Sequence, residues 1–174
     1  SHNKENFAFF MEMGTGKSKV LIDNIAMLHD KGKINGALIV APKGVYRNWE
    51  RQEIPTHMPE HVDYSVLVWN PNSTSFLKEY AKFLKNDDKL KIFLINIDAF
   101  STARGTEIAK RFLVATQCMM AIDESTTVKT PTAKRTKTIC KMRTLAKYRR
   151  ILTGSPVTKS PLDLYTQCYF LDPE

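Results

Sequence analysis

Short apolar runs recur along the chain and are separated by segments whose apolar residues follow helical spacing. Unbroken apolar runs are typical of parallel strands that are buried on both faces. The alternation of strands with helices therefore predicts an α/β fold, with a mostly parallel central sheet that helices cover on both faces. The segments predicted to be strands are 7–11, 37–41, 64–69, 91–97, 118–122 and 150–152.

Helical spacing is clearest in residues 76–84 and 108–113, where apolar side chains recur three and four positions apart. The polar residues 72–74 are expected to cap the first of these helices. Proline, asparagine and aspartate gather between the periodic segments and mark loops there. The predicted loops are residues 54–59, 70–72 and 86–88.

A glycine-rich turn stands between the first predicted strand and a helical segment. Backbone without side chains at Gly14 and Gly16 can direct successive N–H groups at a polyphosphate, and the helix that begins near Lys17 adds the positive end of its dipole. Lys17 can then reach the outer phosphates, and the Ser18 hydroxyl can hold Mg²⁺. The pattern GxxxxGKS/T has a glycine where this chain has Met11, so the match is incomplete. A glycine turn of this composition that arose by chance therefore remains an alternative interpretation.

An acidic pair, Asp123 and Glu124, directly follows the apolar run 118–122. A buried parallel strand delivers such residues to the carboxyl edge of the sheet, where ligands bind. Nucleotide hydrolysis needs two fixed carboxylates in different roles: Asp123 would hold the Mg²⁺ water shell, and Glu124 would orient or deprotonate the attacking water. A solvated acidic turn is the alternative, and the nearby glycine loop favours the functional interpretation.

Composition fits one domain of ordinary size, with 174 residues of which 43% are hydrophobic. We expect a vector-derived scar and tail at residues 1–6 and a single domain at 7–174. The three cysteines, at positions 118, 140 and 168, lack metal-ligand spacing, and their odd number argues against a disulfide framework. No apolar run approaches the ~18 residues of a membrane span. The cysteines thus favour a reducing compartment, and we expect the cytoplasm of a bacterial or phage-infected cell, or the nucleus of a eukaryote.

The net charge of +8 comes from one acid-free segment, residues 129–150. A concentrated basic segment makes a phosphate backbone a plausible partner, although a solvated helix face would have the same composition. Apolar residues at Ile139, Met142, Leu145 and Ala146 predict that one face of the segment belongs to the core. The nine basic residues are Lys129, Lys134, Arg135, Lys137, Lys141, Arg143, Lys147, Arg149 and Arg150.

One further motif is rejected on physical grounds. Residues 57–61 match HxxEH, an inverted zinc-protease pattern that needs both histidines on one helix face. Pro59 stands between them and would remove a backbone donor and clash with the preceding turn. We therefore expect His57 and His61 to be surface-loop residues.

Several motifs in a fixed order give the chain a family resemblance, to Swi/Snf-type ATPases of helicase superfamily two, over residues 11–174. Residues 11–18 (MEMGTGKS) resemble the family's motif I, usually D-E-M-G-x-G-K-T. Residues 41–43 (APK), running on to Asn48 and Trp49, resemble motif Ia. Residues 123–130 (DESTTVKT) resemble D-E-A-H-R-x-K-N, and residues 153–156 (TGSP) resemble motif III.

The resemblance implies a RecA-like P-loop NTPase, a three-layer α/β sandwich, that binds ATP and Mg²⁺. Lys17, Asp123 and Glu124 are then the catalytic residues, and Ser18 and Asp123 hold the metal. The nucleotide-binding residues that it implies are Met13, Gly14, Thr15, Gly16, Lys17, Ser18 and Lys19. The residues that it implies at the nucleic acid, or in coupling to it, are Lys43, Asn96, Ser101, Lys129, Thr153 and Ser155.

The implied activity is a double-stranded-DNA-dependent ATPase that translocates on DNA. Such motors close two RecA-like lobes around ATP, and this chain corresponds to the first lobe, without the adenine-reading Q motif or the second lobe. Because an arginine finger is worth roughly 10³ to 10⁵ in rate in related NTPases, the isolated lobe is expected to be a nearly inactive monomer.

Two other functions stay open from the residues alone. A P-loop kinase would use the same glycine loop, but the sequence has no arginine-rich lid insertion, and its basic residues follow the acidic pair. A non-catalytic module would bind nucleic acid or a partner protein through residues 129–150, with an affinity that falls steeply with salt and ignores ATP.

Overall fold

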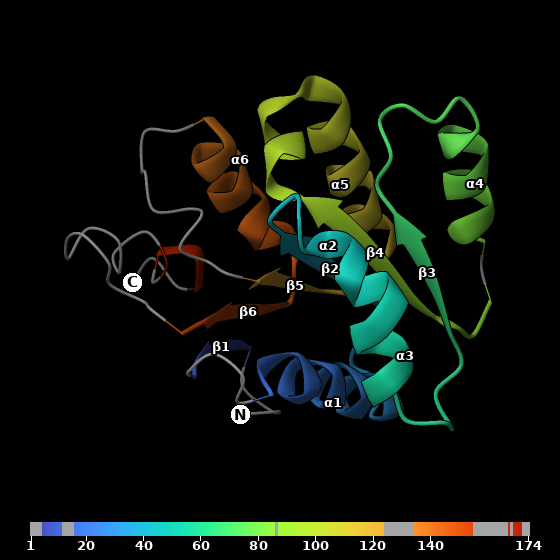
Figure 1. The fold of residues 1–174 in the computed structure, drawn as a ribbon, viewed down its shortest axis with the longest axis vertical. Coiled ribbons are helices and arrows are strands. Elements are labelled where there is room, and N and C mark those ends of the chain that lie inside the picture. The colour runs from blue at the N-terminus through green and yellow to red at the C-terminus, as the bar shows by residue number, and fades with distance from the viewer. Residues whose placement is uncertain are drawn as a thin grey trace.

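The computed structural model describes residues 5–11, 16–85, 87–123, 134–154, 167 and 169–171. Within these residues one six-stranded sheet forms the centre, in the order β1-β6-β5-β2-β4-β3, and every neighbouring pair of strands is parallel. Helices lie on both sides of the sheet (Figure 1). The strands are β1 (Asn6–Phe10), β2 (Gly36–Ala41), β3 (Tyr64–Val68), β4 (Leu90–Asn96), β5 (Cys118–Asp123) and β6 (Tyr148–Thr153).

The predicted strands are confirmed, with ends that differ by one or two residues. Strands β2, β4 and β5 are buried along their whole length, as unbroken apolar runs require. Side chains alternate between the two faces, so that Leu38 and Val40 join one core while Ala37 and Ile39 join the other. β1 begins at Asn6, one residue before the apolar run.

Two groups of helices cover the two faces of the sheet (Figure 1). One face packs against α1 (Lys17–Asp30) and a continuous helical stretch of α2 (Tyr46–Asn48), the π-helical η1 (Trp49–Glu53) and α3 (Ile54–His57). The other face packs against α4 (Phe76–Phe83), α5 (Ala103–Ala115) and α6 (Lys134–Met142). Two short 3₁₀ turns, η2 (Ile97–Ser101) and η4 (Arg143–Leu145), follow β4 and α6. This is the expected three-layer sandwich.

The loop predicted at 54–59 is wrong over its first four residues, because Ile54–His57 is the helix α3. Pro55 is the second residue of α3, which directly follows the π-helical η1, where the i→i−4 hydrogen-bond pattern is already interrupted. His57 ends this helix 3.7 Å from a carboxylate oxygen of Glu53, and His61 lies beyond it, 2.8 Å from one of Asp30. Neither histidine takes part in a metal-binding cluster of three or more His, Cys, Asp or Glu within the described residues.

The basic segment 129–150 is not a single exposed face, which corrects the sequence interpretation. Its end forms β6, where Arg150 is fully buried and Arg149 is half-buried. Ile139, Met142 and Ala146 lie in the core as predicted, whereas Leu145 is 37% exposed because it stands in the short turn η4.

Buried groups elsewhere account for the remaining chemistry of the core. Burial raises the pKa of the Cys118 thiol to about 12, so this residue is a neutral part of the hydrophobic core at physiological pH.

None of the helices in the described ranges is long and apolar enough to cross a membrane.

Candidate nucleotide and nucleic-acid sites

The start of α1 carries the described part of the glycine loop. Gly16 is the N-cap, with φ of +81°, a left-handed conformation that favours glycine, and its carbonyl accepts the first helical hydrogen bond from Val20 N–H. Lys17 and Ser18 therefore occupy the first turn, where backbone N–H groups point out of the helix end. A Cβ on Gly16 would meet nothing within 4 Å among the described residues.

The carboxyl ends of three neighbouring strands lie side by side at the entrance of this loop. Thr153 ends β6 and lies directly opposite Phe10 of β1, and its carbonyl accepts a 3.2 Å hydrogen bond from Met11 N–H at the entrance of the loop. On the other side of β6, Leu152 lies opposite Asp123, the last residue of β5. The structure thus brings the loop entrance, Thr153 and Asp123 to one edge of the sheet, within a span of three strands.

Asp123 lies on the face of the sheet that α1 covers. It has the same orientation as Met119 and Ala121 of β5, which pack in the α1 core, because side chains two positions apart point to one face. Its exposed fraction is 8%, and the indole N–H of Trp49 donates a 2.9 Å hydrogen bond to its Oδ2.

These side chains suit Mg²⁺. A carboxylate at Asp123 and a hydroxyl at Ser18 are hard oxygen donors, which Mg²⁺ prefers over nitrogen or sulfur. Asp123 lies on the sheet face that α1 covers, Ser18 stands in the first turn of α1, and the dipole of α1 favours anionic phosphates at its start. Ser18 and Asp123 would hold Mg²⁺ there, and a bound Mg²⁺ would supply positive charge that neutralises the phosphates of a nucleotide.

Lys19, a further residue of the expected nucleotide-binding set, stands in the first turn of α1. Its ammonium forms an exposed ion pair with Asp23, 2.6 Å away and one turn along the helix. Several other expected site residues lie outside the described residues. These are Met13, Gly14, Thr15, Glu124, Lys129 and Ser155.

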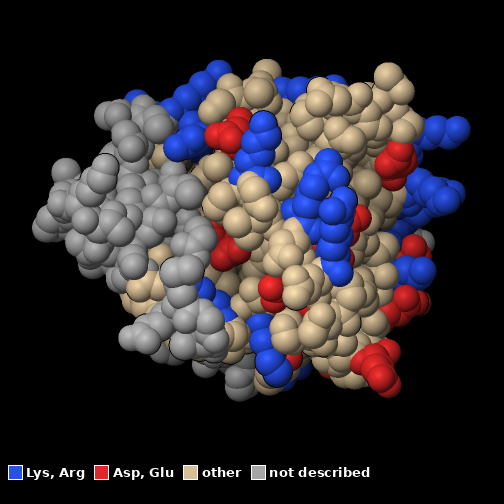
Figure 2. Space-filling view, viewed as in Figure 1, with Lys and Arg blue, Asp and Glu red and all other residues tan. Residues whose placement is uncertain are grey.

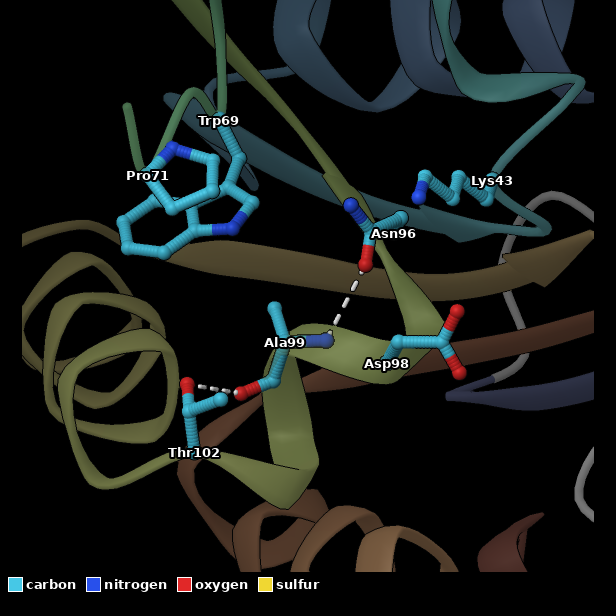
Figure 3. Close-up of a pocket in the computed structure, with 7 residues that line it drawn as sticks. All are labelled: Lys43, Trp69, Pro71, Asn96, Asp98, Ala99 and Thr102. Atoms are coloured by element: carbon cyan, nitrogen blue, oxygen red, sulfur yellow. Dashed lines mark hydrogen bonds between the residues drawn. The ribbon is translucent and has the colours of Figure 1, made fainter. Parts of the chain in front are cut away.

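A second site, a pocket of about 210 Å³, lies farther along the same edge, where β2, β3 and β4 end. Lys43, just after β2, extends toward Asn96 at the end of β4, and Asp98 borders the same space (Figure 3). The Asn96 side-chain oxygen accepts a 3.0 Å hydrogen bond from Ala99 N–H and so caps the 3₁₀ turn η2. Lys43 and Asn96 are therefore brought together as expected, whereas Ser101 is exposed at the end of η2 and does not line the pocket.

An aromatic and basic rim completes this pocket. Trp69 and Pro71 form its apolar wall (Figure 3). The Arg104 guanidinium lies 5.8 Å from the centre of the Trp69 ring and donates a 3.1 Å hydrogen bond to the Pro71 carbonyl. Asp98, which would repel a phosphate, is paired with Arg135 of α6 at 3.1 Å, so its charge is offset at the pocket.

Sequence reasoning gave no role to three of these residues: Trp49, Trp69 and Arg104. The sequence placed Trp49 in the motif Ia match and Trp69 at the end of a predicted strand. It did not predict that Trp49 would contact Asp123 or that Trp69 would contact Arg104. Arg104 lies after a turn whose path depends on η2, and no periodic signal marks that turn.

Charge on the surface is mixed. On the face that Figure 2 shows, Lys and Arg side chains lie in several separate groups with Asp and Glu between them. The basic residues of α6 are exposed or half-buried and lie beside η2, to which Arg135 connects them. The positive surface near the pocket therefore combines Lys43, Arg104 and α6.

The parallel sheet between two helical layers, with a glycine loop opening α1 and an acid ending β5, defines a P-loop domain of the RecA-like class. In agreement, the solved structure titled "Sulfolobus solfataricus SWI2/SNF2 ATPase core in complex with dsDNA" matches 97% of this chain and 31% of its own chain, with a TM-score of 0.71 and 23% identity. That likeness confirms the fold.

The family is shown by sequence. The model of the SNF2-related domain matches residues 1–174, and the chain belongs to that family, as its motifs predict. Among curated relatives, the ISWI chromatin-remodeling complex ATPase CHR17 of Arabidopsis thaliana is 30% identical over 165 residues, 94% of this chain and 14% of that protein. Chromatin remodeling factor mit1 of Schizosaccharomyces pombe is 24% identical over 163 residues, 93% of this chain and 11% of that protein. The chain thus spans a small part of these relatives.

Proposed function

We propose that this chain is the ATP-binding lobe of a double-stranded-DNA-dependent ATPase that translocates on DNA. In this proposal the loop through Gly16 binds the phosphates, Lys17 neutralises their charge, and Ser18 and Asp123 hold Mg²⁺. Glu124 orients or deprotonates the attacking water. Thr153, beside the loop entrance, and Ser155 couple the nucleotide to the grip on DNA.

One observation supports the proposal: Met11 at the entrance of the glycine loop, Thr153 and Asp123 lie at the carboxyl edge of three adjacent strands. In an open parallel sheet this edge is where ligands bind. Membership of the SNF2-related domain family supports the same assignment, and so does a structural neighbour whose title names an ATPase core with double-stranded DNA. The compartment would be one that holds DNA.

Two substitutions in the full-length protein test the nucleotide site. Lys17→Ala should abolish ATP binding and turnover, because the phosphates lose their cation. Glu124→Gln should keep ATP binding and lower turnover by about 10² to 10⁴, the usual contribution of a positioned general base. Binding of a fluorescent ATP analogue and release of phosphate measure the two effects.

Lys33→Ala is the matched control, because Lys33 is an exposed lysine just beyond the far end of α1. Its binding and turnover should equal those of the wild type. Turnover that survives both Lys17→Ala and Glu124→Gln would overturn the proposal, and transfer of phosphate to an added acceptor without stimulation by DNA would favour a kinase instead.

The DNA backbone is proposed to run over the pocket of Lys43, Asn96 and Trp69. A cation beside an aromatic wall suits a phosphate–sugar backbone, because the cation binds phosphate while the ring packs on sugar or base.

Completion of the ATPase requires a second RecA-like lobe that supplies an arginine. The isolated lobe should therefore be a monomer that hydrolyses ATP roughly 10³ to 10⁵ times more slowly than the complete motor.

A second candidate function is favoured by α6, whose exposed lysines and half-buried Arg135 stand beside the pocket. The chain would then bind nucleic acid without catalysis. DNA titrations at two salt concentrations, each with and without ATP, separate the two functions. Affinity that depends on salt and ignores ATP would support the non-catalytic module, whereas affinity that ATP changes supports the motor lobe.

A further inference from the structure

The hydrogen bond between Trp49 and Asp123 joins the helix after β2 to the end of β5. Trp49 is fully buried, and its Nε1–H lies 2.9 Å from Asp123 Oδ2. A neutral donor that meets a carboxylate makes a charge-assisted bond, which is stronger than a bond between neutral groups. The contact is therefore an energetically significant interaction at the carboxylate proposed to hold Mg²⁺.

The surroundings of Trp49 fix the direction of its N–H. The residue opens the π-helical segment η1, a type of distortion that recurs at functional sites. One turn earlier, Tyr46 is also buried, and its hydroxyl donates to the Trp69 carbonyl at 3.4 Å. The two aromatic residues thus anchor the start of this helix in a close-packed core, where a two-ring side chain cannot turn without displacing its neighbours.

A carboxylate without such a donor is poorly oriented. Rotation about the terminal bond of an aspartate has broad preferences, so β5 alone fixes the position of Asp123 but not the plane of its carboxylate. The indole N–H selects one plane by binding Oδ2 from the side of η1.

We propose that Trp49 is a positioning residue that orients the Asp123 carboxylate for Mg²⁺ binding. This inference rests on the proposed function of Asp123 as a metal ligand. Trp49 touches neither nucleotide nor reacting atoms in this role; it acts through Asp123. Residues that orient metal ligands in this way usually change metal affinity about 10- to 100-fold when they are replaced.

The test measures metal binding directly, with Mn²⁺ as the probe and ADP present. In the full-length protein, Trp49→Phe removes the N–H and keeps an aromatic ring. Mn²⁺ affinity, measured by electron paramagnetic resonance, should fall about 10- to 100-fold. ADP affinity measured in excess EDTA should stay at the wild-type value, because Trp49 is not among the residues proposed to bind the nucleotide.

Tyr80→Phe is the matched control. Tyr80 is buried on α4, on the other face of the sheet, and its hydroxyl donates a 3.0 Å hydrogen bond to the Ile108 carbonyl. This variant also removes one buried aromatic donor, but it should leave Mn²⁺ affinity unchanged. An equal loss in both variants would mean general loosening of the fold and would overturn the positioning role.

A closer isostere keeps the test decisive if Trp49→Phe does not fold. Benzothienylalanine at position 49 replaces the indole N–H by sulfur and preserves the two-ring shape, and it should lower Mn²⁺ affinity in the same way. The indole proton resonance, identified by its loss in either variant, should shift and exchange faster in Asp123→Ala.

The outcomes for the two proposals are distinct. Mn²⁺ affinity unchanged by the isostere would overturn the positioning role, even where Lys17→Ala abolishes ADP binding as the proposed function requires. ADP binding that is indifferent to Lys17→Ala would overturn the proposed function itself. An indole proton unaffected by Asp123→Ala would remove the hydrogen bond on which the inference stands.

Discussion

At the residue scale, Arg150 is a charged side chain buried in the core. Its guanidinium is fully buried in β6 and donates to the Asn24 side chain at 2.9 Å and to the carbonyls of Glu5 and Arg149 at 2.7 and 2.8 Å. Burial lowers the pKa of Arg150 to about 10, so it remains charged at pH 7. The fork of donors ties α1 and the chain before β1 to β6.

Arg150→Lys tests this connection. One ammonium cannot reproduce a planar fork that meets acceptors on three segments, and some of them would stay buried without a donor. We expect the free energy of unfolding to fall by about 2–4 kcal/mol, measured by urea denaturation at pH 7. Lys141→Arg, an exposed exchange of the same residue types on α6, should change it by less than about 0.5 kcal/mol. Equal small effects would show that the buried fork is dispensable.

At the scale of elements, the sequence predicts those whose burial is uniform. Strands β2, β4 and β5 follow from apolar runs, because both faces of these strands are covered. The helical stretch ending in α3 was missed because Pro55 and the histidines suggested a loop, while the buried anchors Tyr46 and Trp49 lie upstream. β6 was predicted too short because its first half, Tyr-Arg-Arg, has the composition of a charged surface.

In the candidate site, too, the residues marked by local motifs were predictable from the sequence, whereas those that contact distant segments were not. The loop at Gly16 and the acid at Asp123 were predictable, because their motifs are local and their strands end at a common edge. The partners Trp49 and Arg104 were not, because their contacts join segments far apart in sequence, 74 residues in the case of Trp49 and Asp123. Such pairs depend on side-chain packing across elements, which a local pattern does not encode.

The junction of η2 and α5 depends on one glycine. A Cβ on Gly105 would clash with the carbonyl oxygen of Ala99 and lie 2.8 Å from the Ala99 side chain, and a carbonyl cannot turn aside as a flexible side chain can. Gly105→Ala should therefore push α5 away from η2, lower the free energy of unfolding by about 1–3 kcal/mol and disturb the Lys43 pocket.

Thermal unfolding and DNA affinity measure these two effects of Gly105→Ala. Gly44→Ala is the matched control for stability, because a Cβ on Gly44 meets nothing within 4 Å in the part of the chain that the structure describes. It should leave the melting temperature close to that of the wild type. A Gly105→Ala protein as stable as the control would show that η2 and α5 can separate without cost.

At the scale of the whole molecule, one edge of the sheet carries both the proposed nucleotide site and the pocket of Lys43. The proposed nucleotide site lies at the ends of β1, β6 and β5, and the pocket of Lys43 lies at the ends of β2, β4 and β3. β2 and β5 are direct neighbours, with Val40 opposite Ile122, so the two sites meet at the centre of the sheet. A DNA backbone bound at the pocket of Lys43, as proposed, would lie next to β5, the strand that ends in Asp123.

The salt dependence of DNA binding tests the second of these sites. Each phosphate contact releases condensed counterions, so the loss of one contact makes the slope of log affinity against log salt shallower by about 0.9. Lys43→Ala in the full-length protein should show this change, and Lys82→Ala, an exposed lysine of α4, should not. Equal slopes in both variants would exclude a phosphate contact at Lys43. Lys137→Ala on α6 extends the comparison, because Arg135 of the same helix pairs with Asp98 at the pocket and so places α6 beside it. A slope change of similar size in Lys137→Ala would indicate that DNA also contacts α6.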